Sequence, residues 1–183
     1  FHAEKEEFLL HLSRVQDDKG SIEFVALCVS TGMAGMLAGE DLYVPDPLGY
    51  VRRVMEACEQ SGGLVRYLGR VPHDYKLELL QQARCLVSPL KAPYIEIFGL
   101  SLVEAMACGT PVLVTDQGAP RELVVHGVTG AIARDLGCLE QNLAIALKCE
   151  PAACRKRAEE FPREKMALEY LALYEAMLQG ESW

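Results

Sequence analysis

The chain has 183 residues, of which 50% are hydrophobic and 24% are charged, and its formal net charge is −8. This length suffices for one domain with a substantial core and is too short for two ordinary domains. The acidic balance argues against broad nucleic-acid binding, which requires a basic surface, and no apolar run approaches the length of a membrane span.

The seven cysteines are odd in number, and they form no C-x-x-C pair and no cluster with histidine. Most of them sit inside apolar helical or strand patterns, where cysteine behaves as a small hydrophobic residue. We therefore expect neither a zinc site nor a disulfide framework, and we expect a reducing, cytoplasmic environment.

The hydrophobic pattern predicts strands and helices in alternation along the chain. Strands are expected at 7–13, 33–38, 64–68, 85–89, 112–115 and 131–133. Helices are expected at 22–29, 46–59, 74–83, 99–107, 121–125, 136–149, 151–160 and 163–179. The second helix would start with Asp46 as its N-cap and Pro47 at its first position.

This alternation is typical of an α/β fold, a Rossmann-like doubly wound parallel sheet of about six strands with helices on both faces. In such a sheet ligands bind at the carboxyl ends of the strands. The residues that follow the predicted strands should therefore gather at one edge: Arg14, Lys19, Gly39, Val71, the loop at 90–99 and Asp116.

One stretch near the middle of the chain carries two acids, Glu96 and Glu104, eight positions apart. Between and beyond them, residues 99–107 are strong helix formers, and Gly109 is a natural C-terminal stop. The N-terminus of such a helix offers free N–H groups and a partial positive charge, which suit a phosphate group.

Glu104 lies inside this predicted helix, and its immediate neighbours are apolar. The apolar positions Leu100, Val103 and Ala107 define the helical pattern, so we expect the helix to be largely buried. A buried acid needs a partner or a ligand, which favours a binding role for Glu104 over that of an ordinary surface acid.

The segment E-I-F-G-L-S-L-V-E-A-M-A-C-G-T-P-V strongly resembles a motif of the family 4 retaining glycosyltransferases of the GT-B fold. Further pieces occur in the order of that family: Leu12-Ser-Arg14 with Lys19-Gly20, Met36–Gly39, Tyr67–Val71, Gly118–Glu122 and His126–Gly130. The resemblance spans nearly the whole chain, but it covers only the C-terminal, nucleotide-sugar half of a GT-B enzyme. Ser13 stands where the family usually has glycine, and His126 stands where Asp or Asn is common.

The resemblance implies that Arg14 and Lys19 bind the donor diphosphate and neutralise charge as the nucleotide leaves. It also implies that Glu96 contacts the donor sugar near the reacting centre and that Glu104 holds the ribose hydroxyls. The plain alternative is that the two cations are solvated loop residues, as most Arg and Lys are. We favour binding because both follow a strand that is predicted to end at the cleft.

The backbone should complete the donor site. The N–H groups of Phe98, Gly99 and Leu100 would receive sugar hydroxyls or phosphate oxygens, and Gly99 permits close approach of the backbone. Val71 would offer backbone hydrogen bonds to the nucleobase. No D-x-D motif appears, so we expect no metal and no cofactor, and cationic side chains with the helix dipole would hold the diphosphate.

Together these features predict that residues 1–183 form the single donor-binding domain of a retaining glycosyltransferase, which moves a sugar from a nucleoside diphosphate sugar to an acceptor. The chain starts without methionine, and we expect the acceptor half to be a missing N-terminal domain. The helix at 163–179 would pack toward that domain, and the fragment alone would transfer nothing. The alternatives are a GT-B nucleotide-sugar epimerase or phosphorylase, and a non-catalytic nucleotide-binding module.

Overall fold

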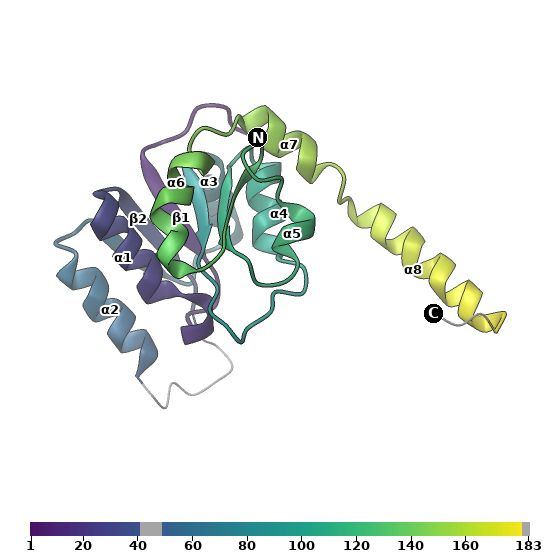
Figure 1. The fold of residues 1–183 in the computed structure, drawn as a ribbon, viewed down its shortest axis with the longest axis horizontal. Coiled ribbons are helices and arrows are strands. Elements are labelled where there is room, and N and C mark those ends of the chain that lie inside the picture. Colours follow the sequence, from purple (N-terminus) through teal and green to yellow (C-terminus); the bar gives the residue numbers. More distant parts are fainter. Residues whose placement is uncertain (41–48, 181–183) are drawn as a thin grey trace.

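The sheet has six parallel strands, and helices lie on both of its faces (Figure 1). The structure is a computed structural model, which describes residues 1–40 and 49–180. The strand order is β3-β2-β1-β4-β5-β6. The strands are β1 Phe8–Leu12, β2 Ala34–Ala38, β3 Val65–Gly69, β4 Cys85–Ser88, β5 Val112–Thr115 and β6 Gly130–Ala133.

Two groups of helices sandwich this sheet. One face is covered by α1 (Ser21–Thr31), α2 (Tyr50–Gln60) and α6 (Leu139–Ala146). The other face is covered by α3 (His73–Gln82), α4 (Leu100–Ala107), α5 (Pro120–Leu123) and α7 (Pro151–Ala158). Short 3₁₀ helices, η1 (Asp17–Lys19) and η2 (Leu136–Cys138), lie in the connections. The predicted α/β fold class is confirmed.

The strands are apolar on both sides because both faces of a covered parallel sheet are buried. Phe8 and Leu10 of β1 belong to the core beneath α3 and α4, and Leu9 between them belongs to the core beneath α1 and α2. All three side chains are buried. This arrangement explains why the strands appear in the sequence as short continuous apolar runs.

Some predicted element bounds are wrong. Residues 136–149 do not form one helix: η2 comes first and α6 ends at Ala146, which agrees with the poor helix propensity of Gly137. The helix expected to open at Asp74 starts at His73, with Pro72 as its N-cap. The helix predicted at 121–125 ends at Leu123, because the next residue is extended. The predicted helix start at 46–47 lies outside the described residues.

Helix α8 (Arg163–Leu178) projects away from the rest of the molecule (Figure 1). The prediction of a helix here is confirmed, and none of its residues is buried. Most of its large apolar side chains are exposed, and those of Met166, Tyr170, Tyr174 and Met177 are each about half exposed. That this helix packs toward another domain stays a prediction.

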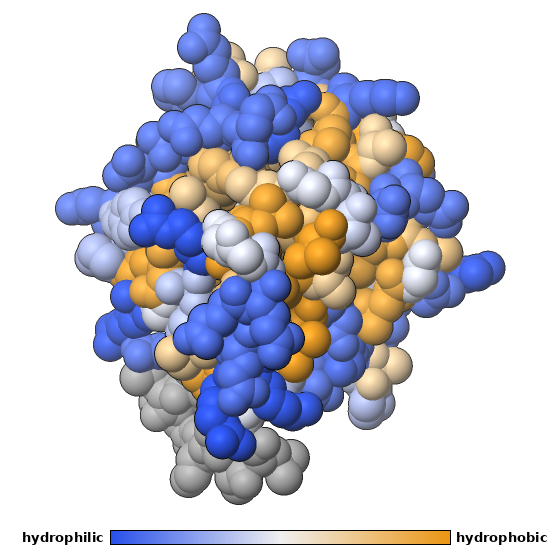
Figure 2. Space-filling model, turned by 90° about the vertical axis from the view of Figure 1, so that its left-hand side faces the viewer, coloured by the Kyte–Doolittle hydropathy of each residue, from blue (hydrophilic) through white to orange (hydrophobic). Residues whose placement is uncertain are grey.

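The side that carries α1 and α2 has a mixed surface, on which apolar patches lie between polar side chains (Figure 2). The exposed apolar residues of these helices include Val29 and Met55. Six of the seven cysteines are buried, and all seven are free thiols. Among the described helices, none has the length and apolar character needed to cross a membrane.

Candidate functional site

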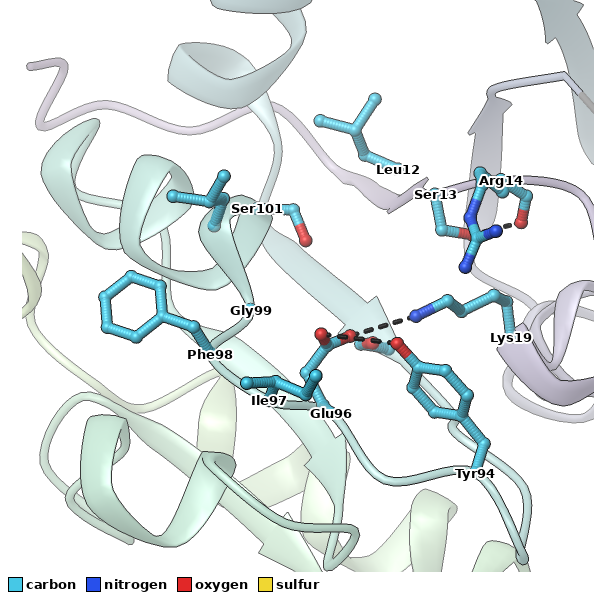
Figure 3. Close-up of a pocket in the computed structure, with 12 residues that line it drawn as sticks. Leu12, Ser13, Arg14, Lys19, Tyr94, Glu96, Ile97, Phe98, Gly99 and Ser101 are labelled. Atoms are coloured by element: carbon cyan, nitrogen blue, oxygen red, sulfur yellow. Dashed lines mark hydrogen bonds and ion pairs between the residues drawn. The ribbon is translucent and has the colours of Figure 1, made fainter. Parts of the chain in front are cut away.

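A crevice opens where the chain reverses its direction of winding. Strands β1 and β4 are neighbours in the sheet, and the chain continues from β1 toward β2 and from β4 toward β5, on opposite sides. At such a switch point the two following loops separate at the carboxyl ends of the strands, and ligands bind between them. A cleft of about 540 Å³ lies here, lined by residues that follow β1 and β4 (Figure 3).

Lys19 reaches into this cleft from η1, and its side chain is only 8% exposed. Its Nζ lies 3.0 Å from Oε2 of Glu96 and 3.7 Å from the centre of the Tyr94 ring. The Tyr94 hydroxyl donates a hydrogen bond of 3.4 Å to Oε1 of Glu96 (Figure 3). Lys19 is thus a largely buried cation, stabilised by a carboxylate and by an aromatic face.

The backbone of Glu96 is clamped by the loop that follows β5. The Glu96 N–H donates to the Gln117 carbonyl at 2.9 Å, and the Ala119 N–H donates to the Glu96 carbonyl at 2.8 Å. Gly118 between them has φ +90°, and a Cβ there would lie 2.5 Å from the Glu96 carbonyl oxygen. Only glycine allows this close approach, which holds the carboxylate opposite Lys19.

Arg14 lines the same cleft, and its side chain is exposed. In the described ranges no ion pair involves its guanidinium. Its five N–H donors are therefore available to an anion, and a guanidinium binds phosphate through two parallel hydrogen bonds.

The start of α4 forms the opposite side of the cleft. Gly99 is the N-cap with φ +88°, which confirms the predicted helix start. The N–H groups of Phe98, Gly99 and Leu100 make no backbone hydrogen bond to any described residue, although all three residues line the cleft. They are free donors at a helix N-terminus, where an anion is favoured. Their role toward a ligand stays a prediction.

Glu104 differs from the prediction: α4 buries Leu102, Ala105 and Met106 fully, whereas Val103 and Ala107 of the expected face are only partly buried. Leu100 is 70% exposed. The Glu104 side chain is 42% exposed, and its Oε1 lies 2.8 Å from Nζ of Lys76 in α3. Glu104 is thus half-exposed, so the burial argument for this residue was wrong, and its partner in the structure is a lysine.

Three further residues follow strands: Gly39 contacts a loop of the cleft, whereas Val71 and Asp116 do not line it. Gly39 contacts the cleft loop, since a Cβ there would lie 1.7 Å from the Ser13 carbonyl oxygen. Val71 is half-buried against the core beneath α3 and does not line the cleft, and Asp116 pairs with Arg121. The expected gathering at one edge therefore holds for the loops after β1, β2 and β4, and the loop after β5 joins them through its backbone contacts with Glu96. The backbone role of Val71 stays a prediction.

Two residues near the cleft carry contacts that the sequence did not indicate. Tyr94 joins Lys19 to Glu96, and its aromatic ring two positions before the acid was the available signal. His11 is buried in β1, with Nδ1 2.9 Å from the Val87 carbonyl oxygen and Nε2 2.9 Å from the Ser13 hydroxyl. A lone polar residue inside an apolar strand was the signal for this contact.

His11 supports the cleft without entering it. Burial is the main cause that lowers the pKa of its imidazole to about 4, and the positive charge of Lys19 contributes to this shift. The ring is therefore neutral at neutral pH: Nδ1–H donates to the Val87 carbonyl, and Nε2 is an acceptor that lies 2.9 Å from the Ser13 hydroxyl and 3.3 Å from the Ser21 hydroxyl. This contact fixes Ser13 beside Arg14, at the position where the related motif has glycine.

Known proteins are similar to this chain in sequence and in architecture. The family model described as Glycosyl transferases group 1 matches residues 52–160. A glycogen synthase of Mycobacterium tuberculosis is 28% identical over 190 residues, which cover 94% of this chain and 43% of that protein.

Two solved structures have a similar fold. A glycosyltransferase involved in avilamycin A biosynthesis superposes with a TM-score of 0.80 at 26% identity, over 99% of this chain and 54% of that one. A sucrose-phosphate synthase from Thermosynechococcus elongatus also has a TM-score of 0.80, at 27% identity, over 96% of this chain and 46% of that one. The chain spans about half the length of these relatives. With its family model matched over more than half of its length, the chain belongs to the group 1 glycosyl transferases.

Proposed function

We propose that this chain is the donor-binding domain of a family 4 retaining glycosyltransferase, which transfers a sugar from a nucleoside diphosphate sugar to an acceptor. The observation that carries the proposal is the convergence of Arg14, Lys19 and Glu96 with the free N-terminus of α4 on one cleft. Membership of the group 1 glycosyl transferases supports it.

In this reaction the cleft would stabilise the diphosphate as it leaves the sugar. Arg14 offers a planar fork of donors, Lys19 a point charge, and the start of α4 a set of oriented N–H groups. Preorganised donors of this kind stabilise the charge that develops on a leaving group, and no cofactor takes part in this proposal.

The two acids would hold the ends of the donor, with Glu96 at the sugar and Glu104 at the ribose. From Gly99 to Glu104, α4 spans roughly 7 to 8 Å at 1.5 Å per residue, which is comparable to the distance from diphosphate to ribose. Retention of the anomeric configuration follows from the resemblance of the motif around these acids to the family 4 enzymes.

The acceptor would be bound by an N-terminal domain outside this chain, toward which α8 would pack. The exposed apolar side chains of α8 support this arrangement. We also place the protein in the cytoplasm, because seven free thiols suit a reducing compartment.

The direct test is titration calorimetry of residues 1–183 with UDP, GDP and ADP. Binding of at least one diphosphate is expected, and Lys19→Met should weaken it about tenfold or more, as expected for the loss of a charge-assisted hydrogen bond. The matched control is Lys148→Met, which removes the same charge from an exposed lysine after α6. It should leave the affinity unchanged.

Four results would contradict the proposal or its parts. Failure of all three diphosphates to bind, or equal losses in the Lys19 and Lys148 variants, would exclude the donor site. Unaltered activity of Glu96→Gln in the full-length protein would favour a non-catalytic nucleotide-binding module. Sugar transfer by residues 1–183 alone would refute the need for a second domain.

A further inference from the structure

An ion pair joins α3 to α4 beside the cleft. Nζ of Lys76 lies 2.8 Å from Oε1 of Glu104, and the lysine side chain is 26% exposed. Glu104 stands four residues after Leu100, which lines the cleft, so both side chains project from the same face of α4. The pair therefore continues the wall of the cleft by one turn of helix, about 5.4 Å.

This contact leaves part of the carboxylate free. A carboxylate has about four positions that accept hydrogen bonds, and Lys76 occupies one of them on Oε1. Oε2 of Glu104 makes no hydrogen bond to any residue in 1–40 or 49–180. The acceptor positions that remain suffice for two neighbouring hydroxyl groups.

The pair also keeps this part of the cleft wall without net charge. A bare carboxylate about one helical turn from the diphosphate position would repel an anionic ligand. Lys76 balances this charge without blocking Oε2, so the wall presents hydrogen-bond acceptors and no net charge. A partly exposed ion pair of this kind contributes little to stability by itself, so holding Glu104 in one orientation is the more consequential effect.

We propose that Lys76 is a positioning residue, which holds the Glu104 carboxylate so that it receives the two ribose hydroxyls of a nucleoside diphosphate. Because this role requires such a ligand in the cleft, it rests on the proposed function. Lys76 acts through Glu104, and the ligand itself contacts the acid.

The test compares UDP, GDP and ADP with their 2′,3′-dideoxy counterparts, by calorimetry on residues 1–183. Lys76→Met should weaken binding of the parent nucleotide about fivefold to tenfold, and binding of its dideoxy counterpart less than twofold, because only the parent has hydroxyls to offer. Lys76→Arg keeps a cation opposite Glu104 and should recover most of the affinity.

A double-mutant cycle gives the second readout. Glu104→Ala should weaken the parent nucleotide by a similar factor, and adding Lys76→Met to it should cause no further loss, because the lysine then has no acid to position. Lys148→Met is again the charge control. Thermal unfolding of each variant checks that the fold is intact.

The results of these experiments distinguish a positioning role of Lys76 from a role in phosphate binding or in folding. Equal weakening of parent and dideoxy nucleotides by Lys76→Met would mean that the lysine acts on the phosphates or on the fold, and would overturn the role. No weakening of either would overturn it as well. If the unmodified chain binds none of the nucleotides, the proposed function itself fails.

Discussion

Lys19 enters the cleft with its charge already balanced, by Glu96 at 3.0 Å and by the ring of Tyr94. A phosphate group at this position would compete with Glu96 for the same ammonium. Under the proposed function, Glu96 would contact the donor sugar and would also compete with the diphosphate for Lys19.

Glu96→Gln should therefore strengthen the binding of UDP, about threefold to tenfold for a largely buried ion pair. Glutamine keeps the size of the side chain and can still accept from Tyr94, while it frees the ammonium and removes a negative charge. Calorimetry with UDP measures the effect. Glu59→Gln, at an exposed acid near the end of α2, is the charge control, and unchanged or weaker binding by Glu96→Gln would show that the acid does not compete.

At the scale of elements, the site depends on how closely the loops approach one another. The loop between β1 and α1 is pressed against the end of β4 at Gly20, which has φ +73°, and a Cβ there would lie 2.0 Å from the Pro89 carbonyl oxygen. Gly32 at the other end of α1 has nearly the same φ, +69°, with nothing within 4 Å. The two glycines thus share a left-handed backbone, and only Gly20 lies close to another segment of the chain.

Gly32→Ala should lower the free energy of unfolding by about 1 kcal/mol, the cost of a left-handed backbone for alanine. Gly20→Ala should lower it by about 3 kcal/mol or more, because the clash with Pro89 adds to that cost. Urea denaturation of the two variants gives both values. Equal losses would mean that the loop moves away freely and that Lys19 is not held by this contact.

At the scale of the whole molecule, α8 lies outside the packed body. Truncation after Pro162 should therefore leave the urea midpoint unchanged, because no residue of α8 is buried. The same truncation keeps Phe161, which packs edge-on against Phe98 at a centroid distance of 6.2 Å. A lower midpoint would show that α8 stabilises the described core.

Most of the fold was predictable, because the signals for it are local. The apolar runs at 8–12 and 112–115 and the glycines and prolines between elements indicated both the strands and their order along the chain. The bounds that were wrong lie where propensity is weak, as at Gly137 in the split between η2 and α6.

The site was predictable in part. Arg14, Lys19, Glu96 and the helix start at Gly99 were placed correctly on one cleft, because each follows or flanks a strand end. The prediction for Glu104 failed in its burial. A short helix with apolar residues on several sides does not reveal which side meets the sheet.

The sequence alone determined the α/β alternation, the cleft at the strand ends and the identity of its main charges, since these depend on periodicity and on residues adjacent in the chain. The tertiary structure decided which face of α4 is buried, and it paired Lys76 with Glu104 and Lys19 with Tyr94 and Glu96. These contacts join residues 28, 75 and 77 positions apart. Their physical basis is the packing of helices and loops on one sheet, which no local pattern encodes.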